Sequence, residues 1–226
     1  MKAYYPAFLN LEGKLCVVIG GGRVAERKIK SLLECGARVR VISPEATAGI
    51  EKLSEEGKLI LEKRIYQKGD LEGAWLVVAA TSDPRVQKGV FEEAESRRIF
   101  CNVVDVPERC SFIVPSVIRR GELCIAISTS GASPALARRI RERLEKEFDS
   151  SWESHVKLMK HIRKEVLSSE LSLKERELKL KKLALVPFYS YFKRKEYSII
   201  KSILKSEGIT CPSWISEAAR TSSTEP

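Results

Sequence analysis

A glycine-rich stretch near the start of the chain has the spacing of a phosphate-binding turn. Gly20, Gly22 and Ala25 fit the pattern G-x-G-x-x-G/A directly after the apolar run 15–19. The first glycine allows a tight turn, the second keeps a Cβ away from the phosphates, and the alanine lets helix and strand pack closely. The N-terminus of the following helix would then bind an anion such as a pyrophosphate. An ordinary turn between a strand and a helix is the other interpretation.

Polar side chains follow two later apolar runs. Thr81 comes directly after the run 75–80, and Asn102 and Asp105 belong to the run 99–105. The carboxyl ends of parallel strands border the ligand crevice of an open α/β sheet, so these side chains are candidates to line a site. Thr81 is equally well explained as an ordinary loop residue. A carboxylate such as that of Asp105 can accept a proton during a reaction.

A second polar loop lies further along the chain. The stretch Thr129-Ser-Gly-Ala-Ser-Pro-Ala135 precedes a helical pattern that runs to about Phe148. Ser133 is a natural N-cap and Pro134 a natural first helical residue, so the loop presents hydroxyls and free N–H groups at a helix start. Ordinary helix capping explains the same residues without a ligand.

Strands and helices that alternate along the chain would position these residues. The apolar runs of residues predict parallel strands at 15–19, 38–43, 59–62, 75–80 and 99–105. The intervening patterns predict helices from Gly22 to Gly36, from Pro44 to near Gly57 and from Asp83 to about Arg98. Later patterns predict a hairpin from the runs 112–118 and 123–128, then helices over 149–226 with a disordered tail Thr221–Pro226.

Length, composition and cysteine spacing exclude several classes of protein. The chain has 226 residues, 43% of them hydrophobic, and a formal net charge of +10. Nothing resembles a signal peptide or a membrane span, so we expect a cytoplasmic protein with no membrane partner. Six cysteines without a C-x-x-C pair argue against a structural metal or a disulfide framework. The basic charge is compatible with nucleic acid or with a small polyanionic substrate and does not decide between them.

Recognition of the ribose would come from the segment after the second strand. No Asp or Glu ends that strand, so Ser43, Glu45 or the backbone must bind the ribose hydroxyls. No nearby arginine is an obvious ligand for the 2′-phosphate of NADP. NAD is therefore preferred over NADP. The predicted cofactor-binding residues are Gly20, Gly22, Arg23, Val24, Ala25, Ser43, Pro44, Glu45 and Thr81.

Several stretches together resemble the precorrin-2 dehydrogenase and sirohydrochlorin ferrochelatase family, which includes the amino-terminal module of siroheme synthase. The resemblance keeps the order and spacing of the motifs and covers roughly residues 5–150. It is carried by Gly20-Gly-Gly-Arg-Val-Ala-Glu-Arg-Lys28, Ala79-Ala-Thr-Ser-Asp83, Arg98-Ile-Phe-Cys-Asn-Val-Val-Asp105, Ser111-Phe-Ile-Val-Pro-Ser116 and Ser128-Thr-Ser-Gly-Ala-Ser-Pro134.

The resemblance implies a fold, an activity and a set of site residues. The fold is a Rossmann domain over 1–111, a dimerisation and tetrapyrrole-site segment over 112–150 and a helical domain over 151–226. The activity is NAD-dependent oxidation of precorrin-2 to sirohydrochlorin on the way to sirohaem, in some members with insertion of ferrous iron as a further substrate. It also implies a homodimer and a separate protein for the preceding methylation, since no methyltransferase module is present.

The same resemblance gives the residues roles. Asp105 ends the family's Asn-Val-Val-Asp motif and takes the central catalytic role. The residues implied to bind the substrate are Asn102, Ser128, Thr129, Ser130 and Ser133. Thr129 departs from the serine that is frequent in the family but keeps a hydroxyl. Precorrin-2 carries many carboxylates, so it suits a basic chain without nucleic acid as a partner, and the candidate contacts are Arg119, Arg120, Arg138 and Arg139.

A non-catalytic module that senses NAD and reports to a partner is the alternative function. No winged-helix pattern precedes the glycine turn, and such a module would leave the segment 102–105 and the serine loop unexplained. A sensor would bind the cofactor without forming sirohydrochlorin, which separates the two functions by experiment.

Overall fold

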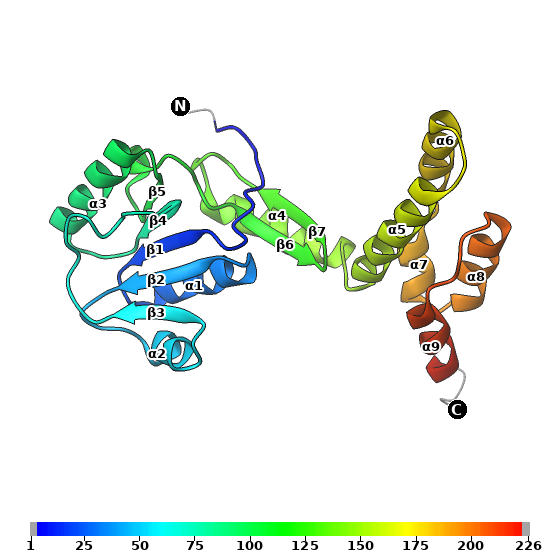
Figure 1. The fold of residues 1–226 in the computed structure, drawn as a ribbon, viewed down its shortest axis with the longest axis horizontal. Helices are drawn as coiled ribbons and strands as arrows, with labels where there is room; N and C mark the ends of the chain where they lie inside the picture. The colour runs from blue at the N-terminus through cyan, green and yellow to red at the C-terminus, as the bar shows by residue number, and fades with distance from the viewer. Residues whose placement is uncertain (1–3, 223–226) are drawn as a thin grey trace. The chain divides into compact units, whose positions relative to one another are not determined.

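The computed structural model describes residues 4–222, which form two compact units that divide between Val114 and Pro115. The first unit is an α/β fold, and the second contains a β-hairpin followed by helices (Figure 1). The expected fold class, a Rossmann domain with a small α+β segment and a helical C-terminal region, is confirmed. The expected domain boundaries after residues 111 and 150 stay predictions.

The first unit is built on a parallel sheet whose strand order is β3-β2-β1-β4-β5 among the described residues. Its strands are β1 (Leu15–Ile19), β2 (Arg38–Ile42), β3 (Leu59–Glu62), β4 (Leu76–Ala79) and β5 (Phe100–Val103). Ile19 pairs with Ile42 of β2 and with Ala79 of β4, so these three strands end level. The order reverses between β1 and β4, and the loops after these two strands therefore border the ligand crevice of such a sheet.

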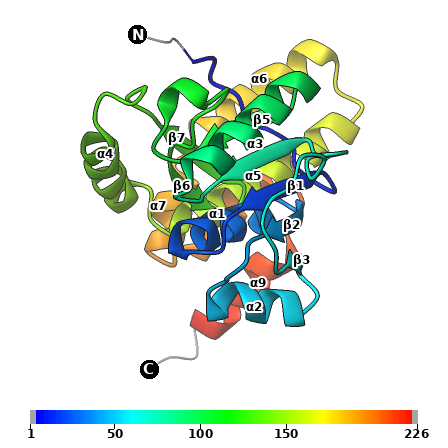
Figure 2. The same cartoon turned by 90° about the vertical axis from the view of Figure 1, so that its left-hand side faces the viewer.

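Helices cover both faces of this sheet (Figure 1, Figure 2). They are α1 (Arg23–Glu34), α2 (Ala48–Glu55) and α3 (Pro84–Arg97). Cys16 and Val18 pack in one apolar cluster with α1 and α2, whereas Val17 and Ile19 pack in the other with α3. Because both faces are covered, β1 is a continuous apolar run, which is why its sequence predicts a buried parallel strand.

The helix expected to begin at Pro44 begins instead at Ala48. Thr47 is its N-cap, and the Thr47 hydroxyl accepts a hydrogen bond from the N–H of Ile50 at 3.4 Å. Proline and glutamate are common in a first helical turn, but a threonine side chain satisfies an N–H group that would otherwise lack an acceptor. The residues after β2 therefore form a loop rather than a helix.

The strands around residues 99–118 are shorter than the apolar runs predict. β5 ends at Val103, so Asp105 lies in a turn beyond the strand, and β6 (Ser116–Arg120) begins after the expected Phe112. The cause is visible in the hydrogen bonds, because the N–H of Ser111 donates to the carbonyl of Cys101 at 2.9 Å. Segment 110–112 thus binds β5 instead of joining the hairpin.

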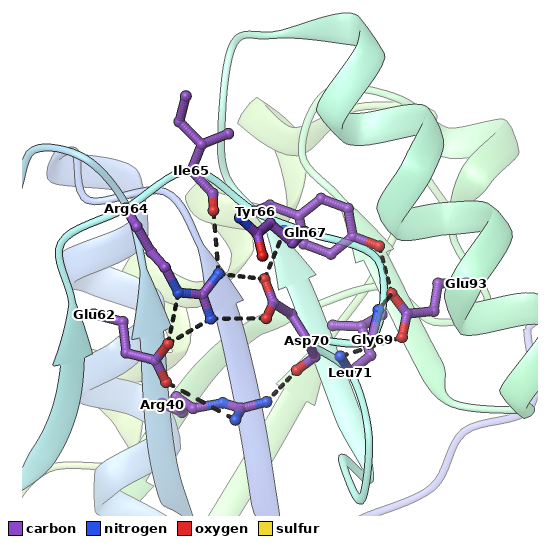
Figure 3. Close-up of polar contacts among 10 residues, drawn as sticks. All are labelled: Arg40, Glu62, Arg64, Ile65, Tyr66, Gln67, Gly69, Asp70, Leu71 and Glu93. Atoms are coloured by element: carbon purple, nitrogen blue, oxygen red, sulfur yellow. Dashed lines mark hydrogen bonds and ion pairs between the residues drawn. The ribbon is translucent and has the colours of Figure 1, made fainter.

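The connection from β3 to β4 has no helix and is held by polar side chains (Figure 3). The guanidinium of Arg64 donates to both carboxylate oxygens of Asp70, at 2.8 and 2.7 Å, and to Glu62. The carboxylate of Glu93 on α3 is 3% exposed and accepts hydrogen bonds from Tyr66 Oη at 2.5 Å and from the Gly69 N–H at 3.0 Å. This network substitutes for the packing that a crossover helix would supply.

The carboxylate of Glu93 is ionised in this network. Burial by itself raises the pKa of Glu93, but hydrogen bonds from Tyr66 and from the N–H groups of Gly69 and Leu71, with the charge of Arg97, outweigh it and lower the pKa overall. The folded pKa lies below the unfolded value, so this stabilisation is complete above about pH 4.5 and is lost as the pH falls through the folded pKa.

Replacing Glu93 by glutamine is expected to lower the free energy of unfolding by about 2 to 4 kcal/mol at pH 7, because a buried network loses its charge. Urea unfolding measures the effect, and the variant should lose less stability than the wild type between pH 5 and pH 3. Glu92→Gln is the matched control. Glu92 is exposed, and its ion pair with Lys88, at 3.6 Å on the surface, contributes little to stability. Equal stability of the two variants would contradict the account.

The second unit begins with an antiparallel hairpin. β6 pairs with β7 (Leu123–Ile127), with Ser116 opposite Ile127. The following helices are α4 (Pro134–Glu147), α5 (Ser151–Ser168), α6 (Leu173–Ala184), α7 (Phe188–Lys193), α8 (Tyr197–Ser206) and α9 (Ser213–Ser222). A buried cluster that includes Leu158, Phe188 and Ile200 holds α5 to α9 together. Residues 221 and 222 of the tail that was expected to be disordered belong to α9, and 223–226 lie outside the described residues.

Candidate active site

The loop from β1 to α1 has the backbone that its glycines predict. Gly20 adopts φ 117°, and a Cβ at this position would lie 2.5 Å from the carbonyl oxygen of Ala80, the residue after β4. Only glycine fits a positive φ and this close approach. The N–H of Gly20 donates to the carbonyl of Ile42 at 2.9 Å, which ties the turn to the end of β2.

The two following glycines face different surroundings. A Cβ on Gly21 would lie 2.0 Å from the carbonyl oxygen of Glu45, whereas a Cβ on Gly22 would meet no atom within 4 Å. Gly21 is therefore needed for contact between two loops, a role that the G-x-G pattern does not indicate. Gly22 leaves open space where the pattern places a phosphate.

The N-terminus of α1 is suited to an anion. Gly22 is its N-cap and supplies no side-chain hydrogen bond, and the first intrahelical bond runs from Glu26 to Gly22. The N–H groups ahead of Glu26 have no intrahelical acceptor, and the helix dipole adds positive potential there. Arg23 and Val24 are exposed, and Ala25 is completely buried against the sheet. These residues fit the pyrophosphate of a dinucleotide cofactor.

The loop after β2 lies against this turn. Ser43 is buried, and its hydroxyl donates to the carbonyl of Glu45 at 2.6 Å, while Pro44 and Glu45 are exposed. The N–H of Thr47 donates to the carbonyl of Gly21 at 2.9 Å. The loop is thus held beside the glycine turn, and roles of Ser43, Pro44 and Glu45 in binding the cofactor stay predictions.

Thr81 follows β4 at the other side of the point where the strand order reverses. Its hydroxyl accepts from the N–H of Asp83 at 3.3 Å, and its carbonyl accepts from the side chain of Gln87 at 2.8 Å. Asp83 caps α3 as expected, with its carboxylate accepting from the N–H of Arg85. These contacts show a local structural role for Thr81, and its contact with a cofactor stays a prediction.

Asp105 lies in the turn directly after β5 and is exposed. It adopts φ 63°, a left-handed conformation that few residues other than glycine take, although aspartate tolerates it better than most. Within residues 4–222 the Asp105 carboxylate makes no hydrogen bond or ion pair. An exposed carboxylate without a partner is available to accept a proton from a bound substrate.

Asn102 lies on β5 and is 9% exposed. Its side-chain nitrogen donates to the carbonyl of Phe112 at 3.0 Å. This donor group of Asn102 therefore stabilises the segment after the Asp105 turn, a use that the sequence does not predict. Contact of Asn102 with a substrate stays a prediction.

The serine-rich loop belongs to the second unit. Thr129 Oγ1 accepts from the N–H of Ser133 and donates to the carbonyl of Ser133, both at 3.0 Å, while Ser133 Oγ accepts from the N–H of Leu136 at 3.2 Å. Ser130 adopts φ 53°, and its N–H donates to Ser128 Oγ at 3.0 Å. Ser133 therefore caps α4 as expected. Hydrogen bonds within the loop stabilise it, and Ser128 and Ser130 are exposed.

The four candidate arginines differ in exposure and in the contacts that hold them. Arg120 donates to the carbonyl of Phe148 at 2.7 Å, which ties the hairpin to the end of α4. Arg138 pairs with Glu142 at 2.8 Å. Arg119 and Arg139 are exposed. Arg138 is exposed as well, so three of the four guanidinium groups face solvent, where an anionic ligand could meet them.

The cysteines and other metal ligands do not gather into a second site in the part of the chain that the structure describes. No group of three His, Cys, Asp or Glu side chains there could hold a metal ion. Burial raises the pKa of the Cys16 thiol to about 11 and of the Cys101 thiol to about 12, so both are protonated at neutral pH. No helix among residues 4–222 is both long and apolar enough to cross a membrane.

Two family models match consecutive parts of the chain. Residues 7–116 match a model described as putative NAD(P)-binding, and residues 120–147 match one described as sirohaem biosynthesis protein central. Siroheme synthase of Citrobacter koseri is 47% identical over 142 residues, and that of Methylobacillus flagellatus is 44% identical over 140. The likeness that the motifs predict is thus confirmed, since the chain is similar over residues 7–147 to NAD(P)-binding and sirohaem-biosynthesis proteins, siroheme synthase among them.

The match covers a small part of the siroheme synthases but nearly all of one solved structure. The matched region is 63% of this chain and 31% of the Citrobacter koseri protein, and the corresponding shares for the Methylobacillus flagellatus protein are 62% and 30%. The chain thus spans about a third of these siroheme synthases. A solved structure named SirC, precorrin-2 dehydrogenase, is 27% identical with a TM-score of 0.72, and the match covers 85% of this chain and 98% of that one.

Proposed function

We propose that this chain oxidises precorrin-2 to sirohydrochlorin with NAD as the hydride acceptor, a step towards sirohaem. The observation that carries the proposal is the α1 N-terminus, which has an open Gly22 and no side-chain cap, in a chain similar to siroheme synthases and to a precorrin-2 dehydrogenase. The exposed Asp105 carboxylate after β5 supplies the second chemical group that the oxidation needs. NAD rather than NADP as the preferred cofactor and a cytoplasmic location stay predictions of the sequence.

The residues of the chain divide the chemistry between them. The N–H groups at the start of α1 bind the pyrophosphate, and the loop 43–45 beside the glycine turn contacts the ribose. Bound NAD supplies the hydride acceptor. Oxidation of the tetrapyrrole also releases a proton from a pyrrole nitrogen, and Asp105 accepts it as general base. Iron insertion, where the family performs it, takes ferrous iron as a substrate and also releases pyrrole protons, so the same carboxylate would serve.

Hydroxyls and cations of the second unit would recognise the substrate's carboxylates. Ser128 and Ser130 are exposed, and Thr129 and Ser133 brace the loop that presents them. Arg119 and Arg139 are exposed cations in the same unit. Charge-assisted hydrogen bonds from such groups suit carboxylates. These assignments rest on the resemblance and on exposure.

The test of this function is turnover with defined substrates. Precorrin-2 is incubated anaerobically with NAD, NADP or no cofactor, each with and without ferrous iron, and the absorption spectrum of the tetrapyrrole product is recorded. We expect sirohydrochlorin to form fastest with NAD, and sirohaem to appear with iron if the chain is also a chelatase. Binding of NAD without any product would instead support a sensing module.

We expect the protein to be a homodimer in solution, with the segment 112–150 in the interface. Apolar residues of this segment are poorly covered, with Val114 44% and Leu136 49% exposed, and β7 is only half-buried. A two-stranded hairpin is marginal without further packing, so a second copy would complete it. Light scattering at micromolar concentration measures the mass.

A leucine elsewhere in the chain offers a matched control for the dimer. Leu136→Asp should shift the mass towards the monomer, because a charge would be buried in the interface. Leu178→Asp introduces the same charge at a leucine on α6 that is 59% exposed and lies outside the segment, so it should leave the mass unchanged. A monomeric wild-type protein would refute the expectation.

A further inference from the structure

The Asp105 turn is clamped from inside the fold by one thiol. Cys110 Sγ lies 3.2 Å from the carbonyl oxygen of Val103 and 3.3 Å from that of Val106, and its thiol donates to both. A thiol has one hydrogen, which these two carbonyls share. The two acceptors flank Asp105 on either side, so a single 9% exposed side chain links the start of the turn to its end.

Other hydrogen bonds fix the position of Cys110 itself. Asn102 Nδ2 lies 3.6 Å from Cys110 Sγ and 3.0 Å from the carbonyl oxygen of Phe112. The hydroxyl of Ser111 accepts from the N–H of Cys101 at 2.8 Å, and the N–H of Ser111 donates to the Cys101 carbonyl. Segment 110–112 is therefore fastened along β5, and the hydrogen bonds run from Asn102 to the thiol and on to the turn.

The turn at Asp105 needs these hydrogen bonds because its backbone has an unfavourable conformation. Asp105 has a backbone φ of 63°, which residues other than glycine seldom adopt. A residue keeps such a conformation only where its surroundings hold it. The Asp105 carboxylate has no partner of its own within residues 4–222 that would fix it. Its direction is therefore set by the backbone of residues 103–106.

We propose that Cys110, oriented by Asn102, is a positioning residue that holds the Asp105 carboxylate in the direction needed to accept a proton from the substrate. The inference rests on the proposed function of Asp105. In this role Cys110 acts through the Asp105 turn and does not contact the substrate or the cofactor. A small shift of a catalytic group costs rate rather than affinity, so the loss of this clamp lowers kcat and leaves the KM for NAD unchanged.

Four variants of the 226-residue chain test the proposal. Cys110→Ala removes the thiol, Cys110→Val removes it but fills its space in an extended backbone that suits valine, and Cys110→Ser restores a donor. Cys101→Ala is the matched control, since it deletes a completely buried thiol from the same apolar cluster without touching the turn. Steady-state turnover of precorrin-2 and hydrogen exchange of the free protein are measured for each.

The expected result separates positioning from stability. Cys110→Ala and Cys110→Val should lose about 10- to 100-fold in kcat with unchanged KM for NAD, and Cys110→Ser should recover most of it. The N–H of Val106 donates to the Val103 carbonyl at 3.2 Å across the turn, and it should exchange at least about tenfold faster in the first two variants only. Cys101→Ala should lower the melting temperature without changing kcat. In an Asp105→Asn background, Cys110→Val should have no further effect on kcat.

Two results would overturn the proposal and are distinct from failure of the proposed function. Normal kcat in folded Cys110→Val, while Asp105→Asn is impaired, would show that the clamp does not position the carboxylate. A further loss of kcat from Cys110→Val in the Asp105→Asn background would show that the thiol acts independently of Asp105. Full activity of Asp105→Asn by itself would instead remove Asp105 from the reaction.

Discussion

Replacing Asp105 by asparagine is expected to lower the rate of sirohydrochlorin formation by about 10² to 10⁴, the usual contribution of a general base. Asparagine keeps the size of the side chain and tolerates the left-handed φ of 63°, but it cannot accept the proton. The affinity for NAD, measured by calorimetry, should be unchanged, because the glycine turn that binds the cofactor is untouched.

Alanine at the same position gives a second expectation. Asp105→Ala should lose as much activity and also about 1 kcal/mol of stability, since alanine adopts a positive φ less readily than aspartate. Any ferrochelatase activity should fall in both variants, because the same base would take the pyrrole protons. A structural role for Asp105 predicts the opposite pattern, in which the melting temperature drops while turnover per folded molecule stays near normal.

Replacing Gly22 by aspartate is expected to weaken NAD binding by more than about 100-fold. A Cβ at this position meets no protein atom within 4 Å, so the substitution extends into open space where the glycine pattern places the pyrophosphate, and its charge opposes that group. Gly22 has φ −80° and ψ −178°, an extended conformation that aspartate adopts readily, and aspartate is a favourable N-cap. The melting temperature should therefore stay equal or rise while binding is lost.

The neighbouring glycine provides the matched control for this prediction. A Cβ on Gly21 would lie 2.0 Å from the backbone oxygen of Glu45, so Gly21→Ala should lower the melting temperature by displacing the loop after β2. The two variants together separate a glycine required by a ligand from one required by packing. Calorimetry that finds unchanged NAD affinity in Gly22→Asp would show that this turn is not the cofactor site.

Periodic apolar runs explain why the first unit was largely predictable. β1 and β3 have the expected bounds, and β2 and β4 end within a residue of theirs, because buried parallel strands are continuous apolar segments. The predicted start of α2 at Pro44 was wrong because the side chain of Thr47 caps the helix, which places its first residue at Ala48. The predicted start of β6 was wrong because residues 110–112 bind β5, a contact between neighbouring segments that the apolar pattern does not encode.

The site was predictable where its chemistry depends on residue type and less so where it depends on packing. The glycine turn, the N-caps Asp83 and Ser133 and the exposed Asp105 follow from motif and position. The clamp by Cys110 carries no local signal, because a buried thiol has the sequence appearance of a small hydrophobe. The network around Glu93 is equally hidden, since Tyr66 and Gly69 lie more than twenty residues away along the chain.

The measurement that tests the central claim most directly is the stoichiometry of cofactor and product in a single anaerobic reaction. Precorrin-2 and NAD are mixed with the wild-type protein, and NADH and sirohydrochlorin are followed together by absorbance. The account predicts one NADH for each sirohydrochlorin, no product without NAD, and loss of both signals in Asp105→Asn. NAD that binds in calorimetry while neither NADH nor sirohydrochlorin forms would contradict it.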